Sequence, residues 1–393
     1  MSLYLWVCYS AVRAAWKSFI EGTFAILSGI SPLFIKAYQS NPQQPNDLES
    51  NNTVGVASRT SGHVTYTVRP LFQSDLNIVG IGASGQVYEV DKEIVLKSCR
   101  IFEQPGSEAS DSDRYHYASD TIFHFSLLQD ERFILRLLQQ FPHPHIVEAI
   151  DTDQAEGIFL RRYQPLLEGE IHAQPTRIRW YRDIADALCH LHNLEIAHGD
   201  VRIDNVLFDT RGSAILCDFS AASPFGQSNL VISDLPLPVN GPSPNLSEAT
   251  DMFAMGSLLF QVEHGIQPEL SVGRDGGLIL PRIHTNHQGI DAVIRNAWLG
   301  HYSSTSEMLE DLHSLDAQSG QGINDTQIHS EPIAPLRERI RAWRKRRENN
   351  FGCVLDGILS GDQLQVLADC YGLDKDAELR FTAYDIRMHG NKL

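Results

Sequence analysis

Short runs of β-branched and aromatic residues begin at Val64 and give way, after residue 98, to apolar residues at helical spacing. The runs VTYTV, NIVGIG, QVYEV and EIVLKS are bounded by glycine and polar residues, which is typical of strands. An acidic, serine-rich stretch from Glu103 to Asp113 predicts an exposed loop, and FSLLQDERFILRLLQQF then predicts a helix. Helical patterns dominate from Thr176 into the middle 310s. Because strands come first and helices later, we predict an α+β fold in two lobes.

The N-terminal end is apolar and is separated from this pattern by a polar stretch. In residues 1–38, Arg13, Lys17 and Glu21 recur every four positions and share one face of a predicted helix. No apolar run there is long enough to span a bilayer. Two interpretations are open, a helix that packs on the rest of the protein or one that weakly contacts a membrane surface. Residues 39–63 are rich in Asn, Gln, Ser and Pro and predict a flexible linker.

The rest of the chain divides into a strand-rich lobe, a helical lobe and a helical C-terminal extension. We place these at residues 64–165, 166–316 and 333–393, with a second linker at 317–332. The extension carries RERIRAWRKRR, from Arg337 to Arg347, in which seven basic residues accompany one glutamate. Such a segment is either a patch for nuclear import or an acidic surface, or a helix docked on this chain's own acidic lobe.

Composition narrows the class of protein. Of 393 residues, 42% are hydrophobic and 21% charged, which is typical of globular chains, and 32 Lys and Arg against 49 Asp and Glu give a net charge of −17. Such a surface repels phosphate backbones, so we expect no nucleic-acid partner and only a local phosphate site. Six scattered cysteines without a CxxC pair indicate a reducing compartment. We therefore expect a cytoplasmic protein, with the nucleus as the alternative; the oligomeric state is not predicted.

The first chemical motif is a glycine-rich turn between two predicted strands. Gly80, Gly82 and Gly85 form a GxGxxG pattern that leads to Val87 in a strand, whereas a dinucleotide fold needs a helix there. Glycines let backbone N–H groups approach phosphate oxygens. The next strand ends at Lys97, whose positive charge suits the same phosphates.

The second motif lies in AHGDVRIDNVL and ILCDFS. Asp200, Asn205 five positions later and Asp218 between apolar runs provide a base and two oxygens that face a metal. With these motifs in this order, the chain resembles the eukaryotic protein kinases from about Leu71 to about Asp316. The resemblance implies an antiparallel N-lobe sheet with one helix, called helix C, and a mainly helical C-lobe.

The resemblance also implies transfer of the ATP γ-phosphoryl group to a protein hydroxyl, with Ser/Thr favoured. Lys97 would hold the phosphates, Glu131 of helix C would pair with it, and Asp200 would accept or orient the hydroxyl proton. Arg202 would neutralise charge on the moving phosphoryl group. The implied residues are, for catalysis, Asp200, Lys97 and Arg202; for ATP, Gly80, Gly82, Gly85, Val87, Val95, Lys97, Glu131 and Leu207; and for Mg²⁺, Asn205 and Asp218.

Further matches are a stacked spine of Leu135, His198 and Phe219, and Asp251, the counterpart of the aspartate that holds the catalytic loop. Departures keep alternatives open. Gly199 makes the HRD motif HGD, which is also found in small-molecule phosphotransferases similar to aminoglycoside and choline kinases. Ser220 makes DFG into DFS. The third alternative is a pseudokinase that binds nucleotide without transfer.

Two other departures concern the segment from Phe219 to Pro244, which the resemblance implies is the activation segment. Both halves of the family's Glu–Arg pair are absent, because Ser243-Pro244-Asn245 stands in the APE region and Tyr302-Ser303-Ser304 stands where RPS is common. Gly199 offers no charge to a phosphate. We therefore predict that activity does not depend on phosphorylation of the segment's serines, which are Ser223, Ser228 and Ser233.

Overall fold

The computed structural model describes residues 68–82, 84–166, 172–231, 237–316 and 331–385. The chain divides into two compact units, Met1–Thr65 and Tyr66–Leu393, and every described residue belongs to the second. The predicted N-terminal helix, the linker at 39–63 and all but the last residue of VTYTV therefore lie outside the described residues. Among the helices of the described part, none has both the length and the apolar character to cross a membrane.

An antiparallel sheet forms the first half of this unit, and its middle strand is buried throughout. The strands run in the order β1-β2-β3-β5-β4, and β3 is buried at each of its six residues. Burial on both faces explains the uninterrupted apolar run around Lys97. The predicted strands NIVGIG, QVYEV and EIVLKS are confirmed. The bounds are β1 Ile78–Ile81, β2 Gly85–Glu89, β3 Ile94–Cys99, β4 Ala149–Asp151 and β5 Ile158–Arg161.

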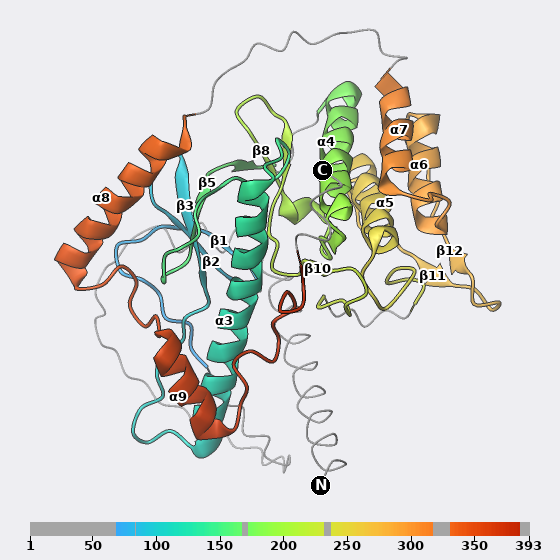
Figure 1. The fold of residues 1–393 in the computed structure, drawn as a ribbon. Coiled ribbons are helices and arrows are strands. Elements are labelled where there is room, and N and C mark those ends of the chain that lie inside the picture. The colour runs from blue at the N-terminus through green and yellow to red at the C-terminus, as the bar shows by residue number, and fades with distance from the viewer. Residues whose placement is uncertain (1–67, 83, 167–171, 232–236, 317–330, 386–393) are drawn as a thin grey trace, which may run out of the picture. The chain divides into compact units, whose positions relative to one another are not determined.

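One long helix, α3 (Asp111–Gln140), packs on this sheet (Figure 1). The loop expected from Glu103 to Asp113 is right as far as Ser110 and wrong beyond it. Ser110 caps the helix by accepting the N–H of Asp113, whose carboxylate in turn accepts the N–H of Ser110. Acidic residues in a first turn are also favoured by the helix dipole, so Asp111 and Asp113 are helical.

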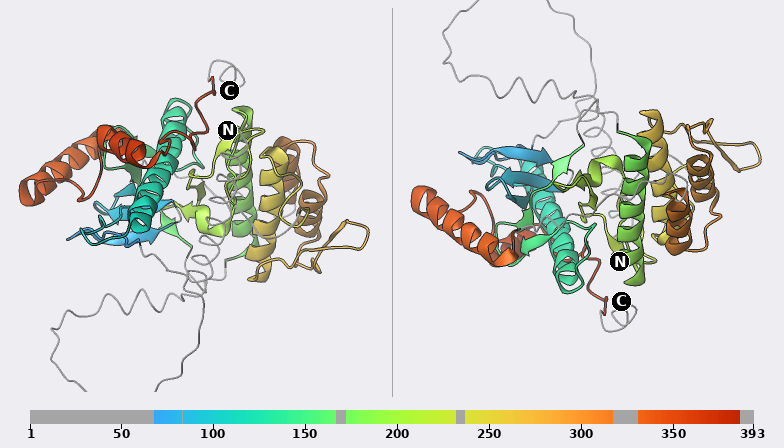
Figure 2. Two further views of the ribbon diagram at one scale, coloured as in Figure 1. Left: turned by 90° about the horizontal axis from the view of Figure 1, so that it is seen from below. Right: turned by 90° about the horizontal axis from the view of Figure 1, so that it is seen from above.

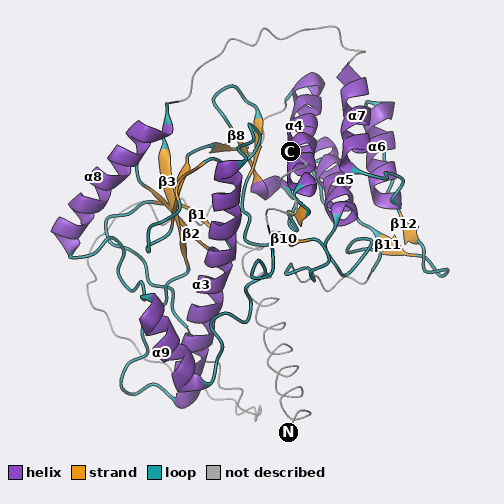
Figure 3. Ribbon diagram, in the orientation of Figure 1, coloured by secondary structure: helices purple, strands orange, loops and turns teal. Residues whose placement is uncertain are grey.

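Helices dominate the second half (Figure 3), so the predicted two-lobed α+β fold is confirmed. A short hairpin, β8 to β9, places Asn205 just before its first strand and Asp218 two residues after its second. Because the strands are antiparallel, both residues lie at one end of the hairpin. The elements are β6 Gln164–Pro165, α4 Gln174–Asn193, β7 Ile196–Ala197, η1 Ile203–Asn205, β8 Val206–Phe208, β9 Ala214–Leu216, β10 Ser223–Pro224, α5 Glu248–His264, β11 Ser271–Val272, β12 Leu278–Ile279, α6 Gln288–Leu299 and α7 Thr305–Asp316.

The basic segment forms helix α8 (Ile333–Phe351), which lies against the sheet in both views of Figure 2. Trp343 is buried edge-on to Phe159 of β5, with ring centroids 5.9 Å apart. Arg339 binds Asp91 and Glu93 beside the sheet. Of the two interpretations of this segment, the structure shows docking on the chain's own acidic lobe.

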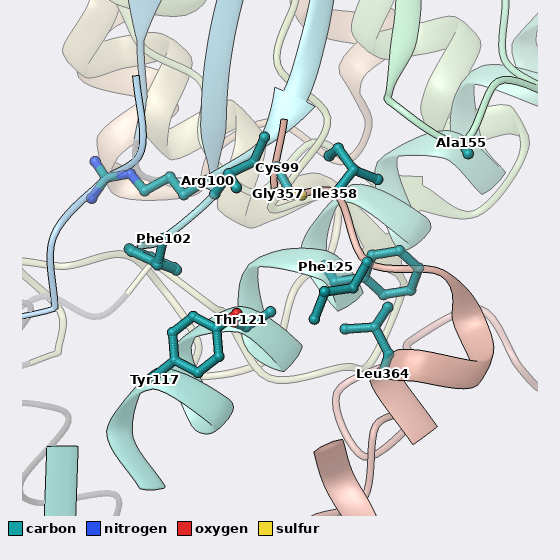
Figure 4. A pocket seen from close by; sticks show the side chains of 12 residues that line it. Cys99, Arg100, Phe102, Tyr117, Thr121, Phe125, Ala155, Gly357, Ile358 and Leu364 are labelled. Carbon is teal, nitrogen blue, oxygen red and sulfur yellow. The ribbon is translucent and has the colours of Figure 1, made fainter. Parts of the chain in front are cut away.

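A second C-terminal helix, α9 (Gly361–Tyr371), packs on the first half of α3, where Leu364 and Ala368 meet Ile122. The segment leading into α9 encloses a cavity with Tyr117, Phe125 and Leu364 on its walls (Figure 4). The cavity measures about 20 Å³. That volume suits a water molecule and not a nucleotide, so the joint between α3 and the C-terminal segment is closely packed.

Candidate active site

Lys97 on β3 joins two acidic residues from distant parts of the chain. Its Nζ lies 2.7 Å and 2.8 Å from the two carboxylate oxygens of Glu131 on α3, and 2.8 Å from Oδ1 of Asp218. Burial would lower the pKa of Lys97, but the two carboxylates outweigh it and raise that pKa well above its ordinary value. Lys97 therefore stays charged and has its place fixed.

Glu131 also ties α3 to the segment that follows β9. Its carboxylate accepts the backbone N–H of Phe219 at 3.2 Å. The Phe219 ring is fully buried, and its centroid lies 5.1 Å from that of His198, while Leu135 on α3 is buried as well. The structure thus brings together two members of the expected spine, His198 and Phe219. The Phe219 backbone is also bound to α3 through Glu131.

Asp218 adopts a left-handed backbone conformation, with φ of 62°, that non-glycine residues rarely occupy. The hydroxyl of Ser220 donates to Oδ1 of Asp218 at 2.7 Å, and the Ser220 N–H donates to the same oxygen at 3.3 Å. Although burial acts in the opposite direction, Lys97 and then Ser220 hold the pKa of Asp218 well below its ordinary value. Ser220, a departure from the family pattern, therefore orients the carboxylate, a role that the sequence analysis missed.

The glycines of the first motif serve different purposes. A Cβ on Gly85 would come within 2.1 Å of the Ser98 carbonyl oxygen, so this glycine is needed where β2 passes β3. Gly82 lies over the site, because a Cβ there would be 3.8 Å from Oδ2 of Asp218. Its carbonyl accepts from Arg100 Nε at 3.2 Å and Nη2 at 2.9 Å. This contact of Arg100 was not predicted, because no motif contains the residue.

The remaining nucleotide-site candidates lie on strands around this turn. Gly80 is in β1, Val87 in β2 directly opposite Lys97, and Val95 in β3. Leu207 is on β8 of the second lobe, paired with Ile215. Val95 is buried, whereas Val87 and Leu207 are half-buried. Their proposed contact with an adenine ring stays a prediction.

Asp200 and Asn205 form a second group. Nδ2 of Asn205 donates to Oδ2 of Asp200 at 2.8 Å and to the Asp200 carbonyl at 2.9 Å. Burial raises the pKa of Asp200, partly offset by the positive charge of Arg202, by His198 and by the Asn205 bond. The carboxylate is thus a somewhat better proton acceptor than an exposed aspartate, and it is held in one orientation.

Asp251 on α5 fixes the loop that carries Asp200. Its two carboxylate oxygens accept the N–H of His198 at 2.7 Å and of Gly199 at 3.0 Å. Gly199 has a φ of 77°, and a Cβ there would lie 2.7 Å from the Ala221 carbonyl oxygen. A side chain at this position is therefore opposed by local backbone geometry as well as by contact with the activation segment.

Arg202 lies near Asp200, and its guanidinium pairs with Asp204 while its side chain is 45% exposed. Its expected contact with a phosphoryl group stays a prediction. A different contact joins the helices near the absent Glu–Arg pair. Glu248 at the start of α5 accepts the N–H of Thr305 at 2.9 Å and its hydroxyl at 3.2 Å, which joins α5 to α7.

The donor chemistry at Asn205 and Asp218 fits magnesium. The Asn205 amide N–H₂ faces Asp200, which leaves its Oδ1 as a ligand oxygen, and Asp218 adds a carboxylate of low pKa. Magnesium takes one or two protein oxygens and completes its shell with phosphates and water. Accordingly, the described residues contain no cluster of three or more His, Cys, Asp or Glu that would hold a metal unaided.

The segments that form this site lie within one stretch of sequence that matches a known domain. A family model described as the protein kinase domain matches residues 74–274. The chain belongs to the protein kinase family. Helix α3 is therefore its helix C, β1 to β5 with α3 form the N-lobe, and the helices from α4 to α7 belong to the C-lobe.

Individual kinases are similar to this chain at low identity. Serine/threonine-protein kinase AtPK1/AtPK6 of Arabidopsis thaliana is 28% identical over 211 residues, which cover 50% of this chain and 42% of that protein. Serine/threonine-protein kinase ppk6 of Schizosaccharomyces pombe is 26% identical over 234 residues, 55% of this chain and 30% of that kinase. Serine/threonine-protein kinase PrkC of Bacillus subtilis is 23% identical over 216 residues, 49% and 30% of the two chains. The chain thus spans less than half the length of each.

Proposed function

We propose that this protein is an active, magnesium- and ATP-dependent protein kinase that phosphorylates serine or threonine. One observation carries the proposal: Lys97 contacts both Glu131 and Asp218 while Asn205 holds Asp200. These contacts support the proposal, because the residues that would position phosphates, metal and hydroxyl lie together without a rearrangement of α3. The names of the similar kinases support Ser/Thr as the acceptor.

Bound Mg-ATP would supply the γ-phosphoryl group together with a divalent charge on its phosphates. Lys97 presents a positive charge that two carboxylates keep in one place, which suits the α- and β-phosphates. Gly82 lies over Asp218 and brings backbone to the phosphates without a side chain between them. Asn205 and Asp218 would hold the metal.

At the acceptor end, Asp200 accepts or orients the hydroxyl proton, and its raised pKa favours this role. The Asn205 bond keeps the carboxylate from rotating away. In this proposal Arg202 would leave Asp204 and bind the moving phosphoryl group. Breaking the Arg202–Asp204 pair costs little free energy, because the pair is exposed.

The test is transfer of label from γ-labelled ATP to a mixed protein substrate, with and without magnesium, by the wild type and Asp200→Asn. Aminoalcohol and aminoglycoside acceptors are assayed in parallel. We expect magnesium-dependent label on serine and threonine with the wild type alone. Label only on the small molecules would point to the HGD-type small-molecule phosphotransferases, and no label with retained nucleotide binding would identify a pseudokinase.

A cytoplasmic location and a weak membrane contact through residues 1–38 stay part of the proposal on sequence grounds alone. The nuclear alternative likewise stays a prediction, although Arg339 and Arg344 of the basic segment are bound by acidic residues of the N-lobe. Flotation of the full chain with anionic vesicles, compared with a chain starting at residue 39, tests the membrane contact; equal recovery would exclude it.

A further inference from the structure

A short part of the C-terminal segment, Arg380–Tyr384, lies where helix α3 and the activation segment come together. The Arg380 backbone N–H donates to the carboxylate of Asp130 on α3, at 3.1 Å and 3.3 Å from its two oxygens. The Arg380 guanidinium turns to the activation segment, where Nη1 donates to Ser223 Oγ at 2.7 Å and to the Ser228 carbonyl at 2.6 Å.

The residues that follow Arg380 anchor it on both lobes. Phe381 is buried and stacks on Phe133 of α3, with ring centroids 5.0 Å apart and an interplanar angle of 20°. The hydroxyl of Tyr384 donates to the Leu194 carbonyl, just after α4 in the C-lobe, at 2.8 Å. The guanidinium is therefore delivered to the activation segment by a backbone that is itself fixed on two sides.

Each residue that Arg380 contacts is connected to one of the proposed catalytic groups. Asp130 is next to Glu131, which binds Lys97 and the Phe219 N–H from the other face of α3. Ser223 lies in β10, which pairs with β7, and β7 leads directly into the loop that carries Asp200. A rotation or shift of α3 away from the sheet would break the contacts of both Glu131 and Asp130.

The activation segment itself offers the guanidinium neutral acceptors. Ser223 is fully buried, so its hydroxyl is inaccessible to a modifying enzyme in this conformation, and this hydroxyl donates a hydrogen bond to the Ala221 carbonyl at 3.3 Å. The catalytic loop has Gly199 in place of an arginine. The basic group that meets the activation segment here comes from the C-terminal segment instead.

We propose that Arg380 is a positioning residue that fastens the activation segment to helix α3, keeps Glu131 on Lys97, and makes a phosphate on that segment unnecessary. The backbone N–H of Arg380 binds Asp130, and its guanidinium, which Arg380→Ala removes, binds the activation segment at Ser223 and Ser228. Neither group touches the reacting atoms. The expected effect on kcat rests on the proposed kinase function. The attachment of the activation segment to α3 by Arg380 does not depend on that function.

The experiment compares the full chain with Arg380→Ala, Arg380→Lys and the matched control Lys375→Ala, all treated with phosphatase. Lys375 lies on the same segment and pairs only with its neighbour Asp376 among the described contacts. We expect Arg380→Ala to lower kcat at least tenfold with the KM for ATP changed less than threefold. Arg380→Lys should recover part of the loss, because lysine keeps the charge but spans one acceptor, and Lys375→Ala should match the wild type.

Amide hydrogen exchange on the same proteins separates this inference from the proposed function. Arg380→Ala should speed exchange in residues 133–140 of α3 and in residues 219–228, with no change in α5. This result would support the fastening even if the wild type transferred no phosphate. If Arg380→Ala lowers overall stability, Ser223→Ala should still give a smaller loss of the same kind. Unchanged exchange with wild-type kcat in Arg380→Ala, or a wild type inactivated by phosphatase, would overturn the proposal.

Discussion

Helix α3 has two faces, and adjacent acidic residues show how differently they are bound. Glu131 faces the sheet and binds Lys97, a residue 34 positions away, whereas Asp130 faces the C-terminal segment and binds Arg380, 250 positions away. Both acids are nearly inaccessible, with exposed fractions of 1% and 3%. Burial raises the pKa of each, and each is opposed by a cationic partner.

The difference between the faces is one of chemistry. On the inner face a charged ammonium group meets two carboxylates directly, and the proposed function gives this pairing a catalytic role. On the outer face Asp130 accepts a backbone N–H, and stacked rings such as Phe133 and Phe381 supply much of the contact. The inner face therefore sets the chemistry and the outer face sets the position of the helix. The following predictions test that division.

The largest effect is expected on the inner face. Lys97→Met should lower phosphate transfer at least about 10³-fold, because it removes a fixed charge from the phosphates and leaves two carboxylates facing each other. The matched control is Lys92→Met, the same substitution at an exposed position near the start of the same strand. Steady-state transfer rates decide the matter, and comparable rates for the two variants would refute the role of Lys97.

A large effect on stability, and not on chemistry, is expected where the C-terminal helix α8 packs on the sheet. Trp343→Ala should lower the free energy of unfolding by about 3 kcal/mol, since it removes a buried aromatic side chain and leaves a cavity beside Phe159. The exposed Arg341→Ala on the same helix should cost less than about 0.5 kcal/mol. Urea unfolding of both variants measures the difference. A cost below 1 kcal/mol for Trp343→Ala would show that α8 is not an integral part of the fold.

Two glycines with the same backbone conformation allow a sharper comparison. Gly199 and Gly352 both have a φ of 77°, but only at Gly199 does a Cβ meet a backbone oxygen. Gly352→Ala should therefore cost about 1 kcal/mol, the price of a left-handed alanine. Gly199→Ala should cost more and also lower the transfer rate about tenfold, because the loop bearing Asp200 shifts. Unfolding experiments measure both losses of stability. Equal losses would mean that the backbone around Ala221 shifts to make room for the Cβ without a measurable cost in free energy.

The outer face should also respond to pH. Burial raises the pKa of Asp130 to about 6 despite Arg380, with Glu378 adding to the rise. The folded protein then binds a proton more readily than the unfolded chain, so the contribution of Asp130 to stability falls as the pH rises from about 4 to 6. Asp130→Asn, which keeps an acceptor for the Arg380 N–H, should gain about 1 kcal/mol on the wild type between pH 4 and pH 7.5. Unfolding experiments at both pH values measure this. The same difference in unfolding free energy between variant and wild type at pH 4 and pH 7.5 would contradict the raised pKa.

The smallest effect is expected from the activation-segment serines. Phosphatase treatment, and a variant with Ser228→Ala and Ser233→Ala, should leave specific activity within about threefold of the untreated protein, because no charge-assisted bond worth about 1.5 to 3 kcal/mol is removed. Transfer assays before and after treatment measure this. A loss of orders of magnitude would mean that a phosphate, and not Arg380 alone, orders the segment.

The sequence predicts the inner face well because its residues lie in local patterns. The hairpin of β8 and β9 brings Asn205 and Asp218 to one end. Lys97 stands at the end of an apolar run, and its role follows from the resemblance to the protein kinases. The outer face leaves no such pattern. The contacts of Arg380 and Tyr384 depend on where a long C-terminal segment turns, and its apolar spacing predicts helices without saying which surface they cover. The pair of Arg202 with Asp204 was not predicted either, because the spacing from Asp200 does not say which residue the guanidinium binds.

The central claim is that the contacts on the two faces of α3 depend on each other. A double-mutant cycle of Glu131→Gln and Arg380→Ala, with kcat measured for all four proteins, tests this claim most directly. If Arg380 works by keeping Glu131 on Lys97, Arg380→Ala should lower kcat at least tenfold in the wild type and less than about twofold in Glu131→Gln. Equal fold-losses in the two backgrounds would contradict the account, because Arg380 would then act on the activation segment independently of the Lys97–Glu131 pair.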